Sequence, residues 1–228
     1  RSGESPESCA AIRFAEKKIK NLYHIIIVCD KNSTLAKTGQ ALPKAIVVDM
    51  PEETCDKGFA MTSSVSCMVL ATWCIFHYKS AQVHTDYIRK LADSVERQLQ
   101  SLYDQAMEIA KVDYRRIIWL GSSALKGLAR EACVKSMELT DGYVHAGYDA
   151  PTGFRHGPKT VINDETLTVH FISNLPYTRQ YDIDLMKEMI AEKGKNTIVS
   201  VKAASYAQCN TAEDFEVVYE DAKELPEN

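Results

Sequence analysis

The feature that most constrains the fold of this chain is an alternation of short apolar runs with longer amphipathic segments. The runs are nearly continuous and have the length of strands, which is the pattern of parallel strands covered on both faces. They lie at residues 23–29, 45–49, 117–120, 167–172 and 197–203. The segments between them predict helices over residues 6–20, 85–112, 125–140 and 179–193, with a further helix that ends at residue 77. Strands alternating with helices through short turns predict an α/β fold with doubly wound parallel sheets.

The alternation occurs twice, which predicts two domains. Residues 1–112 form the first domain and residues 113–228 the second. The first begins at Arg1 without a strand leading into its first helix, so we expect it to be truncated, with an opening strand missing at its N-terminus. From Glu213 to Asn228 the sequence is acidic. We expect a loose tail there, which leaves the second domain short at its C-terminus.

The composition argues against several classes of protein. The net charge is −4 and the basic residues are scattered, which argues against nucleic-acid binding. The longest apolar run, Val65 to Phe76, is too short to cross a bilayer core of ~30 Å. Seven cysteines, an odd number without a C-x-x-C pair, indicate free thiols in a reducing compartment rather than disulfides or a zinc site. We therefore expect a cytoplasmic protein without a metal, a cofactor, a membrane or a nucleic-acid partner.

A charged stripe lies on the helix predicted over residues 125–140. Glu131, Lys135 and Glu138 stand at i, i+4 and i+7, so their side chains project from one face of the helix. Acid–base chemistry needs groups of these types close together. The same spacing fits a solvated surface with an i, i+4 ion pair equally well, and spacing alone leaves both interpretations open.

Two further segments carry groups that suit chemistry or ligand binding. His156 lies in the Gly/Pro turn Arg155–Pro158, where an imidazole serves either as an acid–base catalyst or as an ordinary capped side chain. At the start of the chain, Ser5 is a good N-cap residue and Pro6 fits the first helical position. Ser2 and Gly3 precede this helix start, an arrangement that suits a phosphate but also occurs in a plain capped helix.

Specific strings in the sequence decide between these alternatives. The run ELTDGYVHAGYDAPTGFRHGPKTVINDETL at residues 138–167 and the run LPYTRQYD at residues 175–182 resemble the tagatose-6-phosphate ketose/aldose isomerase family. This AgaS-type family, also described as galactosamine-6-phosphate deaminating isomerases, is built from sugar-isomerase (SIS) domains. The resemblance runs from Arg1 to about Ala204. A more distant likeness is to the isomerase half of glucosamine-6-phosphate synthase. The family implies two flavodoxin-like SIS subdomains in this chain.

The resemblance also implies roles for individual residues. Glu138 resembles the enolisation base, His156 the ring-opening acid/base and Lys135 a charge-stabilising partner. The other matches are candidate substrate-binding residues: Ser2, Gly3 and Ser5 match the sugar-phosphate loop, Thr62 and Ser63 belong to a loop that faces the phosphate, and Glu131 lies beside the base. Two positions depart from the family pattern. Lys57 stands where the family usually has Arg, and the turn Gly121–Ala124 has serine where the family tends to have a second glycine.

The resemblance therefore predicts an enzyme. Its reaction would be the conversion of galactosamine 6-phosphate to tagatose 6-phosphate with release of ammonia, in a homodimer or a higher homo-oligomer. The alternative is a SIS-type sensor that binds a sugar phosphate without turnover. Such sensors often carry a helix-turn-helix segment, which is absent here, and they do not need the Glu138 and His156 pair. A third alternative is that a chain of this length is inactive.

Overall fold

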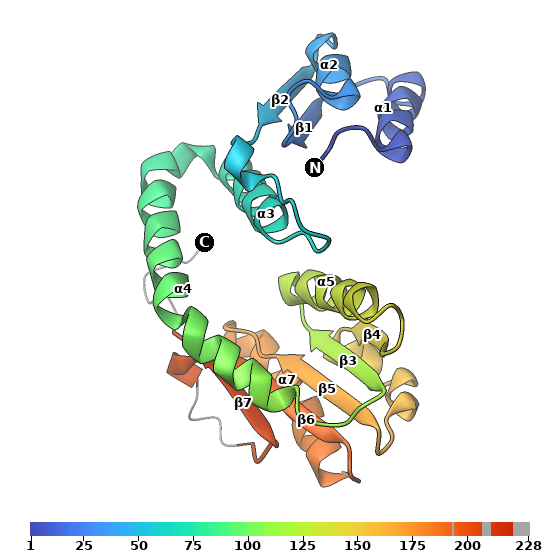
Figure 1. Ribbon diagram of the computed structural model, residues 1–228, viewed down its shortest axis with the longest axis vertical. Helices are drawn as coiled ribbons and strands as arrows, with labels where there is room; N and C mark the ends of the chain where they lie inside the picture. Colours follow the sequence, from blue (N-terminus) through green and yellow to red (C-terminus); the bar gives the residue numbers. More distant parts are fainter. Residues whose placement is uncertain (193, 207–210, 221–228) are drawn as a thin grey trace. The chain divides into compact units, whose positions relative to one another are not determined.

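The computed structural model describes residues 1–192, 194–206 and 211–220, with only the backbone described for residues 80–84. The chain divides into two compact units, Arg1–His84 and Thr85–Asn228 (Figure 1). The predicted domain boundary between residues 112 and 113 stays a prediction, since compactness does not identify either unit with a domain. The two units are described in turn.

The first unit is built around two parallel strands, β1 (His24–Val28) and β2 (Ala45–Asp49), in which Ile26 pairs with Val47. Their core consists of Ile26, Val28 and Ala36. The helices are α1 (Pro6–Lys18), α2 (Thr34–Gln40) and α3 (Ser63–Phe76), with short 3-10 turns η1 (Glu52–Thr54) and η2 (Tyr78–Ser80). The predicted start of α1 is confirmed, because Ser5 caps it and Pro6 is its first residue.

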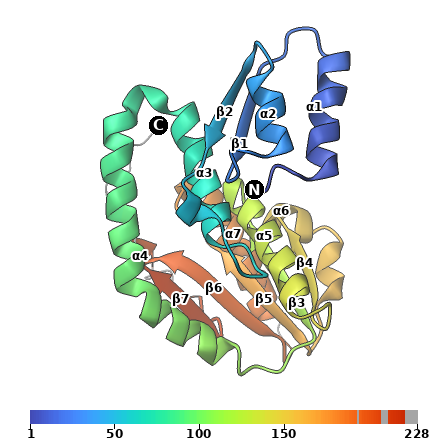
Figure 2. The ribbon, with the colours of Figure 1, turned by 45° about the horizontal axis from the view of Figure 1, so that its top comes forward.

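The second unit contains a five-stranded sheet in the order β4–β3–β5–β6–β7, in which all pairs are parallel (Figure 2). In chain order this is the 2-1-3-4-5 arrangement of flavodoxin-like sheets, so the topological switch lies between β3 and β5. The strands are β3 (Arg116–Gly121), β4 (His145–Asp149), β5 (Thr166–Phe171), β6 (Thr197–Ala203) and β7 (Phe215–Tyr219). The helical elements are α4 (Ala81–Ile109), α5 (Ala124–Leu139), α6 (Pro151–Phe154), η3 (Pro158–Val161), α7 (Pro176–Ala191) and η4 (Ala204–Tyr206).

Apolar clusters cover both faces of this sheet, as the continuous apolar runs predict. On one face Ile118 and Leu120 of β3 pack with Leu185 and Met186 of α7. On the other face Ile117 of β3 packs with Cys133 of α5. Alternate residues of one strand thus serve opposite clusters, which is the consequence of the two-residue period of a strand.

The prediction of a loose tail from Glu213 onward is wrong for the residues that the structure describes. Phe215–Tyr219 forms β7, with Val217 paired to Val201 of β6. The outer edge of β7 meets α4: the Val218 amide donates to Gln105 Oε1 at 3.3 Å, and the Glu220 amide donates to Gln98 Oε1. Glutamine side chains thereby satisfy edge amides that would otherwise be open to pairing. The acidic composition of this segment concealed its alternating apolar residues, and residues 221–228 lie outside the described part.

Helix α7 also differs from its prediction, since it begins at Pro176 instead of residue 179. Pro lacks an amide hydrogen, which costs nothing in the first helical turn, so the helix starts there. The six cysteines in the described residues are free, and Cys209 lies outside them. None of the described helices combines the length and the apolar character that crossing a membrane requires.

The two strand histidines lie in different surroundings. His145 is exposed on the edge strand β4, and His170 of β5 is 1% exposed. Neither ring nitrogen of His170 has a hydrogen-bond partner within the described part of the chain. Burial lowers the pKa of His170 to about 4, although the charge of Glu213 opposes the shift. The imidazole is therefore neutral at physiological pH.

A buried ionic network joins β6 to the segment before β7. The side chains of Lys202 and Glu213 are each 1% exposed, and Lys202 Nζ lies 3.3 Å from Glu213 Oε1. Glu213 also accepts hydrogen bonds from Ser200 and, at 2.6 Å, from Thr211. Burial raises the pKa of Glu213, but these hydrogen bonds and Lys202 outweigh it and lower the pKa overall. A second carboxylate, Glu216, binds Lys202 from a more exposed position.

Replacing Glu213 by Gln should lower the free energy of unfolding by about 3 kcal/mol, because it leaves Lys202 buried with one partner fewer. The pKa of Glu213 is lowered in the folded state from its ordinary value of 4.5. The stability that the ionised Glu213 gives the fold is therefore fully present above pH 4.5, and it is lost as the pH falls through the pKa of the folded state. Urea denaturation at pH 7 and at low pH measures both effects. Glu216→Gln is the matched control, and an equal loss in that variant would contradict the assignment.

Candidate active site

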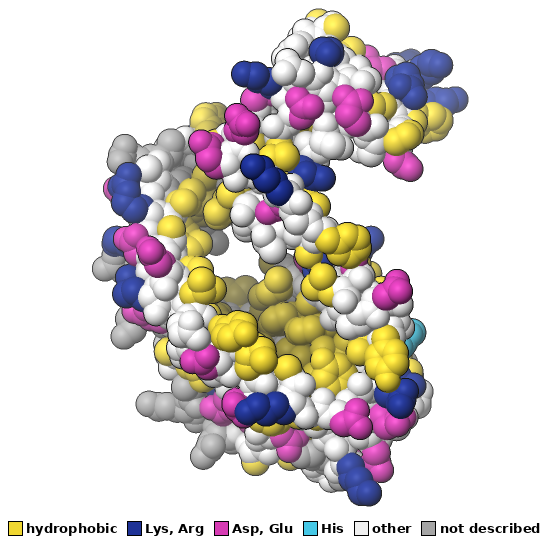
Figure 3. Space-filling model, viewed as in Figure 1, with side chains coloured by type: hydrophobic (Ala, Val, Ile, Leu, Met, Phe, Trp, Pro, Cys, Tyr) yellow, Lys and Arg dark blue, Asp and Glu magenta, His cyan; other side chains and the backbone are white. Residues whose placement is uncertain are grey.

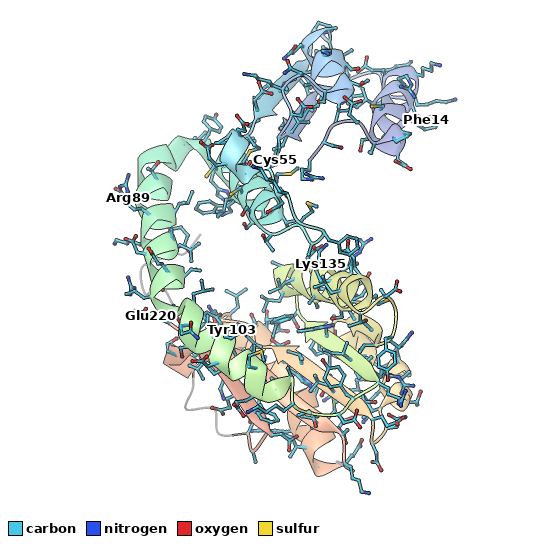
Figure 4. The ribbon with its side chains drawn as sticks, in the orientation of Figure 1. Phe14, Cys55, Arg89, Tyr103, Lys135 and Glu220 are labelled. Atoms are coloured by element: carbon cyan, nitrogen blue, oxygen red, sulfur yellow. The ribbon has the colours of Figure 1, made fainter. Side chains whose placement is uncertain are left out.

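The charged stripe predicted on α5 exists and is held together by ion pairs. Lys135 Nζ lies 2.6 Å from Glu138 Oε2 and 3.8 Å from Glu131 Oε1. The side chains of Lys135 and Glu138 are 25% and 31% exposed, whereas Glu131 is 43% exposed. The ion pairs therefore bring three of the predicted residues together, with Lys135 in the middle. Figure 4 labels Lys135 on α5.

The electrostatics of the stripe favour a permanently charged Lys135. Its hydrogen bond to Glu138 raises its pKa, and the charges of Glu138 and Glu131 add to the effect, although desolvation opposes it. The ammonium group is thus protonated at neutral pH and able to stabilise a negative charge that forms beside it. The same contact ties up one oxygen of the Glu138 carboxylate, so a proton transfer through Glu138 requires that oxygen to be released or the other oxygen to act.

The turn from which α5 starts is fixed by a carboxylate that sequence reasoning missed. Asp182 of α7 is fully buried; it accepts a hydrogen bond from Ser122 Oγ and, at 3.0 Å, one from the Ser173 amide. Burial raises its pKa, against these two hydrogen bonds. Asp182 thereby ties the residues that follow β3 and β5, the two strands at the topological switch, to α7. Ser123 in the same turn has φ +51°, an uncommon conformation for a residue other than glycine.

His156 lies in the turn between α6 and η3 and is exposed. Gly157 follows with φ +125°, a conformation that residues with a Cβ rarely adopt. Among the described residues, His156 makes no side-chain hydrogen bond or ion pair, and none joins it to Glu138 or Lys135. The structure of a single chain therefore does not bring the predicted acid/base and the predicted base together.

Ion pairs on both sides of His156 hold its turn against α7. Arg155 contacts Asp184 at 2.8 Å and Glu188 at 2.9 Å, and Lys159 contacts Glu188 and, at 2.8 Å, Glu192. Asp184 and Glu188 of α7 and its C-cap residue Glu192 stand at i, i+4 and i+8, so they follow one side of that helix. Hydrogen bonding to Lys159 and the charges of Lys159 and Arg155 lower the pKa of Glu188. The sequence contains a signal for this contact that the sequence analysis did not use. Arg155 and Lys159 are four residues apart in the RHGPK string, and the acidic residues 184, 188 and 192 have the same four-residue spacing.

In the first unit, the loop Ser2–Ser5 is engaged in capping. Ser5 Oγ accepts from the Ser8 amide at 3.3 Å, and Ser2 Oγ accepts from the Glu4 amide at 3.3 Å. Gly3 has φ +66°, and a Cβ on it would come within 2.2 Å of Ser33 Oγ. Its close approach to α2 therefore requires glycine. Glu4 caps α2 through Thr34, whose amide and hydroxyl lie 2.6 and 2.8 Å from the Glu4 carboxylate.

The predicted donors before α3 are bound to an internal carboxylate. Asp56 accepts from the Thr62 amide and hydroxyl at 3.1 and 3.2 Å, from the Ser63 amide at 3.0 Å, and from the Ser64 amide and hydroxyl at 2.9 and 2.6 Å. The Ser64 hydrogen bonds come first among the causes that hold the pKa of Asp56 far below its usual range. An anion that uses the Thr62 hydroxyl or these amides has to displace Asp56, whereas the Ser63 hydroxyl is exposed.

The cavities of the molecule only partly coincide with these residues. A cavity of about 530 Å³ in the second unit has Lys135 on its wall and an otherwise mostly apolar lining. Another, of about 630 Å³, lies beside β4 and is lined by Arg116, His145 and Asp149 among others. Within the part of the chain that the structure describes, no three His, Cys, Asp or Glu side chains are grouped so that they could hold a metal ion.

Comparisons with known proteins connect this geometry to a family. No protein-family model matches the sequence. The chain is 40% identical over 206 residues to the D-galactosamine-6-phosphate deaminase AgaS of Escherichia coli O157:H7, covering 90% of this chain and 53% of that protein. It is 38% identical over 205 residues to the protein of the same name from Shewanella sp. strain ANA-3, covering 90% and 51%.

A solved structure agrees with these sequence matches. The crystal structure of tagatose-6-phosphate ketose/aldose isomerase from Escherichia coli superposes with a TM-score of 0.89 at 37% identity, covering 99% of this chain and 60% of that chain. The parallel sheet of the second unit is thus SIS-like, and the chain spans about half the length of the curated relatives that it matches. Over the residues that it spans, the chain belongs to the AgaS-like family of SIS-domain phosphosugar isomerases.

Proposed function

We propose that this chain carries the catalytic residues of a phosphosugar aldose–ketose isomerase, and that it converts galactosamine 6-phosphate to tagatose 6-phosphate with release of ammonia. The observation that supports the proposal is the Lys135–Glu138 pair, 2.6 Å apart on α5. These two residues are the ones that resemble the family's charge-stabilising cation and enolisation base. The relatives' names supply the substrate, since they are D-galactosamine-6-phosphate deaminases.

The reaction needs one base and one positive charge. In the open-chain amino sugar, Glu138 removes the proton from C2, and the electron pair moves into the C1–C2 bond while negative charge develops on the C1 oxygen. Lys135 stabilises that charge. The proton returns to C1 and a second proton moves from the C2 nitrogen to the C1 oxygen, which leaves a hydroxyl at C1 and an imine at C2. Water then adds to C2 and ammonia leaves, so the product is the 2-ketose.

The contact between Lys135 and Glu138 defines the order of events. In the free chain the Lys135 ammonium group holds one oxygen of the Glu138 carboxylate. A substrate whose C1 oxygen lies next to Lys135 takes over part of that contact, which releases the carboxylate oxygen to reach the C2 proton. Glu131, 3.8 Å from Lys135 Nζ, keeps the cation oriented during this exchange.

The remaining predicted residues bind and open the sugar. We assign the phosphate to Ser2, Gly3 and Ser5, with the Ser63 hydroxyl and, after Asp56 is displaced, Thr62 as further donors. His156 opens the ring by proton exchange, for which an imidazole is suited. We assign the two SIS domains to residues 1–112 and 113–228, in a homodimer or a higher homo-oligomer in which the exposed His156 turn reaches the site of the neighbouring subunit.

Replacing Glu138 by Gln keeps the size of the side chain but removes the basic carboxylate. Turnover of galactosamine 6-phosphate should fall by ~10²–10⁴-fold, the usual contribution of general acid–base catalysis, while substrate binding survives. Release of ammonia measures turnover, and exchange of the C2 hydrogen with deuterium from solvent isolates the step assigned to Glu138.

Glu131→Gln is the comparison variant: it removes a carboxylate from the same face of α5 that only orients Lys135, so it should lower the rate of C2 exchange far less than Glu138→Gln. If C2 hydrogen exchange is lost in Glu131→Gln but retained in Glu138→Gln, the base is Glu131 and not Glu138. If Glu138→Gln and His156→Ala alter stability alone and the parent chain binds the sugar phosphate without releasing ammonia, the protein is a sensor of sugar phosphates.

Mixing inactive subunits tests whether His156 acts in the neighbouring site. Glu138→Gln and His156→Ala subunits that exchange freely in a dimer should together regain about a quarter of the parent activity, because half of the dimers are mixed and each has one intact site. The measurement is ammonia release after a cycle of dilution and concentration, with each variant alone as the control. No recovery in a mixture shown to contain mixed dimers would place both residues in the site of one chain.

The acidic side of α7 provides a test of the His156 turn. Glu188→Gln removes the carboxylate shared by Arg155 and Lys159 and should loosen the turn. Opening of the sugar ring depends on His156, so turnover of ring-closed substrate should fall several-fold, whereas C2 exchange on an open-chain analogue should be unchanged. Asp184→Asn, which leaves Lys159 paired, is the milder control. An equal loss with both substrates would mean that Glu188 supports the fold and not the turn.

A further inference from the structure

A cavity of about 630 Å³ lies beside β4, on the face of the sheet opposite to α5. We call it the β4 cavity. Ile118 of β3 and Phe154 of α6 line it, and both belong to the apolar cluster that packs against α7. The mostly apolar cavity with Lys135 on its wall lies on the other face, where Figure 3 shows it as a hydrophobic hollow beside α5. The residues to which we assign the reaction do not line the β4 cavity.

Two side chains with N–H donors meet at one end of the β4 cavity. Arg116 is the first residue of β3 and His145 the first residue of β4, and the two are partners in the register of these strands. Neighbouring strands are about 4.8 Å apart, so the two side chains project next to each other from the same face of the sheet. Both line the cavity. This end of the cavity can therefore donate several hydrogen bonds to one anionic group.

Arg116 is a partly buried cation without a carboxylate partner. Within the described residues, its guanidinium has one hydrogen-bond acceptor, the main-chain carbonyl of Val161, and no ion pair. Arg155 and Lys159, in contrast, each contact two acidic side chains. A guanidinium carries five N–H donors, and a charge withdrawn from water is normally paired. The donors that Arg116 leaves unused therefore indicate an anion that comes from outside the chain.

The acidic residue of the lining does not fill this role. Asp149 lies at the other end of β4, four residues from His145, which is about 13 Å at 3.3 Å per residue. Its carboxylate lies 2.8 Å from Lys126 Nζ and accepts a hydrogen bond from the Ala150 amide at 2.7 Å. Lys126 thus balances the charge of Asp149, and the Arg116 end of the cavity stays open to an anion.

The rest of the lining defines what accompanies the anionic group. Ile118, Phe154, Pro158 and Val161 supply apolar walls. Gly147 is the register partner of Ile118, and a Cβ on Gly147 would come within 3.0 Å of Ile118 Cδ1, so a side chain at residue 147 would narrow the floor. A volume of about 630 Å³ is typical of sites for small organic molecules, and it far exceeds a single phosphate or carboxylate group.

We propose that the β4 cavity binds a small organic anion. Its phosphate or carboxylate group lies on Arg116 and His145, and its apolar body lies against Ile118 and Phe154. The planar guanidinium can pair with two oxygens of either group, and the bound anion supplies the counter-charge that Arg116 lacks in the chain itself. The inference rests on the lining of this cavity and does not depend on the proposed reaction.

Proton–nitrogen correlation NMR spectra of the 228-residue chain test the proposal with two probes, phenyl phosphate and phenylacetate. At least one probe should give saturable shifts of the main-chain amides in β4 and η3, and the probe with the lower Kd identifies the anionic group. Benzyl alcohol is the neutral control and should bind roughly tenfold more weakly or less tightly still, because it lacks charge-assisted hydrogen bonds. Shifts confined to residues 2–5 and 62–64 would mean that the probes bind the proposed phosphate loop alone, which overturns the inference.

Variants assign the binding to particular residues. Arg116→Gln should raise the Kd of the bound probe by roughly tenfold or more. Arg115→Gln is the matched control and should bind like the parent, because Arg115 lies outside the lining and pairs with Glu165 at 3.6 Å. Gly147→Ala keeps every charge but places a methyl group against Ile118, so it should raise the Kd several-fold.

Four results would overturn the proposal: no saturable shift in β4 and η3, benzyl alcohol that binds as tightly as the anions, parent-like binding in Arg116→Gln, or an equal loss in Arg115→Gln. Thermal melting establishes that each variant is folded. If Arg116→Gln does not fold, Gly147→Ala and the neutral control still decide, because neither alters the contact of Arg116 with the Val161 carbonyl.

Discussion

The structure of the second unit depends on burying both faces of one parallel sheet. Strands β3, β5 and β6 are paired on both sides, and their apolar side chains point alternately to two clusters. Each buried aliphatic side chain contributes about 1.5–3 kcal/mol relative to exposure. Helices must cover both faces, so α5 and α7 lie on opposite sides. The position of α5, and with it the charged stripe, follows from this requirement.

The same requirement explains why the stripe is only half buried. Ala129 and Cys133 are the buried residues of α5, and they turn one side of the helix to the sheet. Lys135 lies on the wall of the mostly apolar cavity beside α5 and its side chain is 25% exposed. An ion pair at such a position is less screened than one at the surface, which makes the Lys135–Glu138 contact more effective than an ordinary i, i+3 pair.

Polar interactions in this chain mostly position backbone segments. Asp182 ties the turns after β3 and β5 to α7, and Arg155 and Lys159 fasten the His156 turn to the same helix. In the first unit, Asp56 holds the start of α3. Buried or multiply bonded carboxylates suit this task, because removing one leaves several donors unsatisfied at once. Helix α7 thus supports both the turn that begins α5 and the turn that carries His156.

The sequence by itself determined the order and type of the main helices and strands and the face shared by Glu131, Lys135 and Glu138, because these depend on periodicity within a few residues. The family, and with it the roles proposed for the site residues, followed from specific strings. Only the tertiary structure decided that β7 completes the sheet, that Asp56 occupies the donors before α3, and that Asp182 and Glu188 act as anchors. These contacts join residues far apart in the chain or depend on the direction of one side chain, and local patterns carry no information about either.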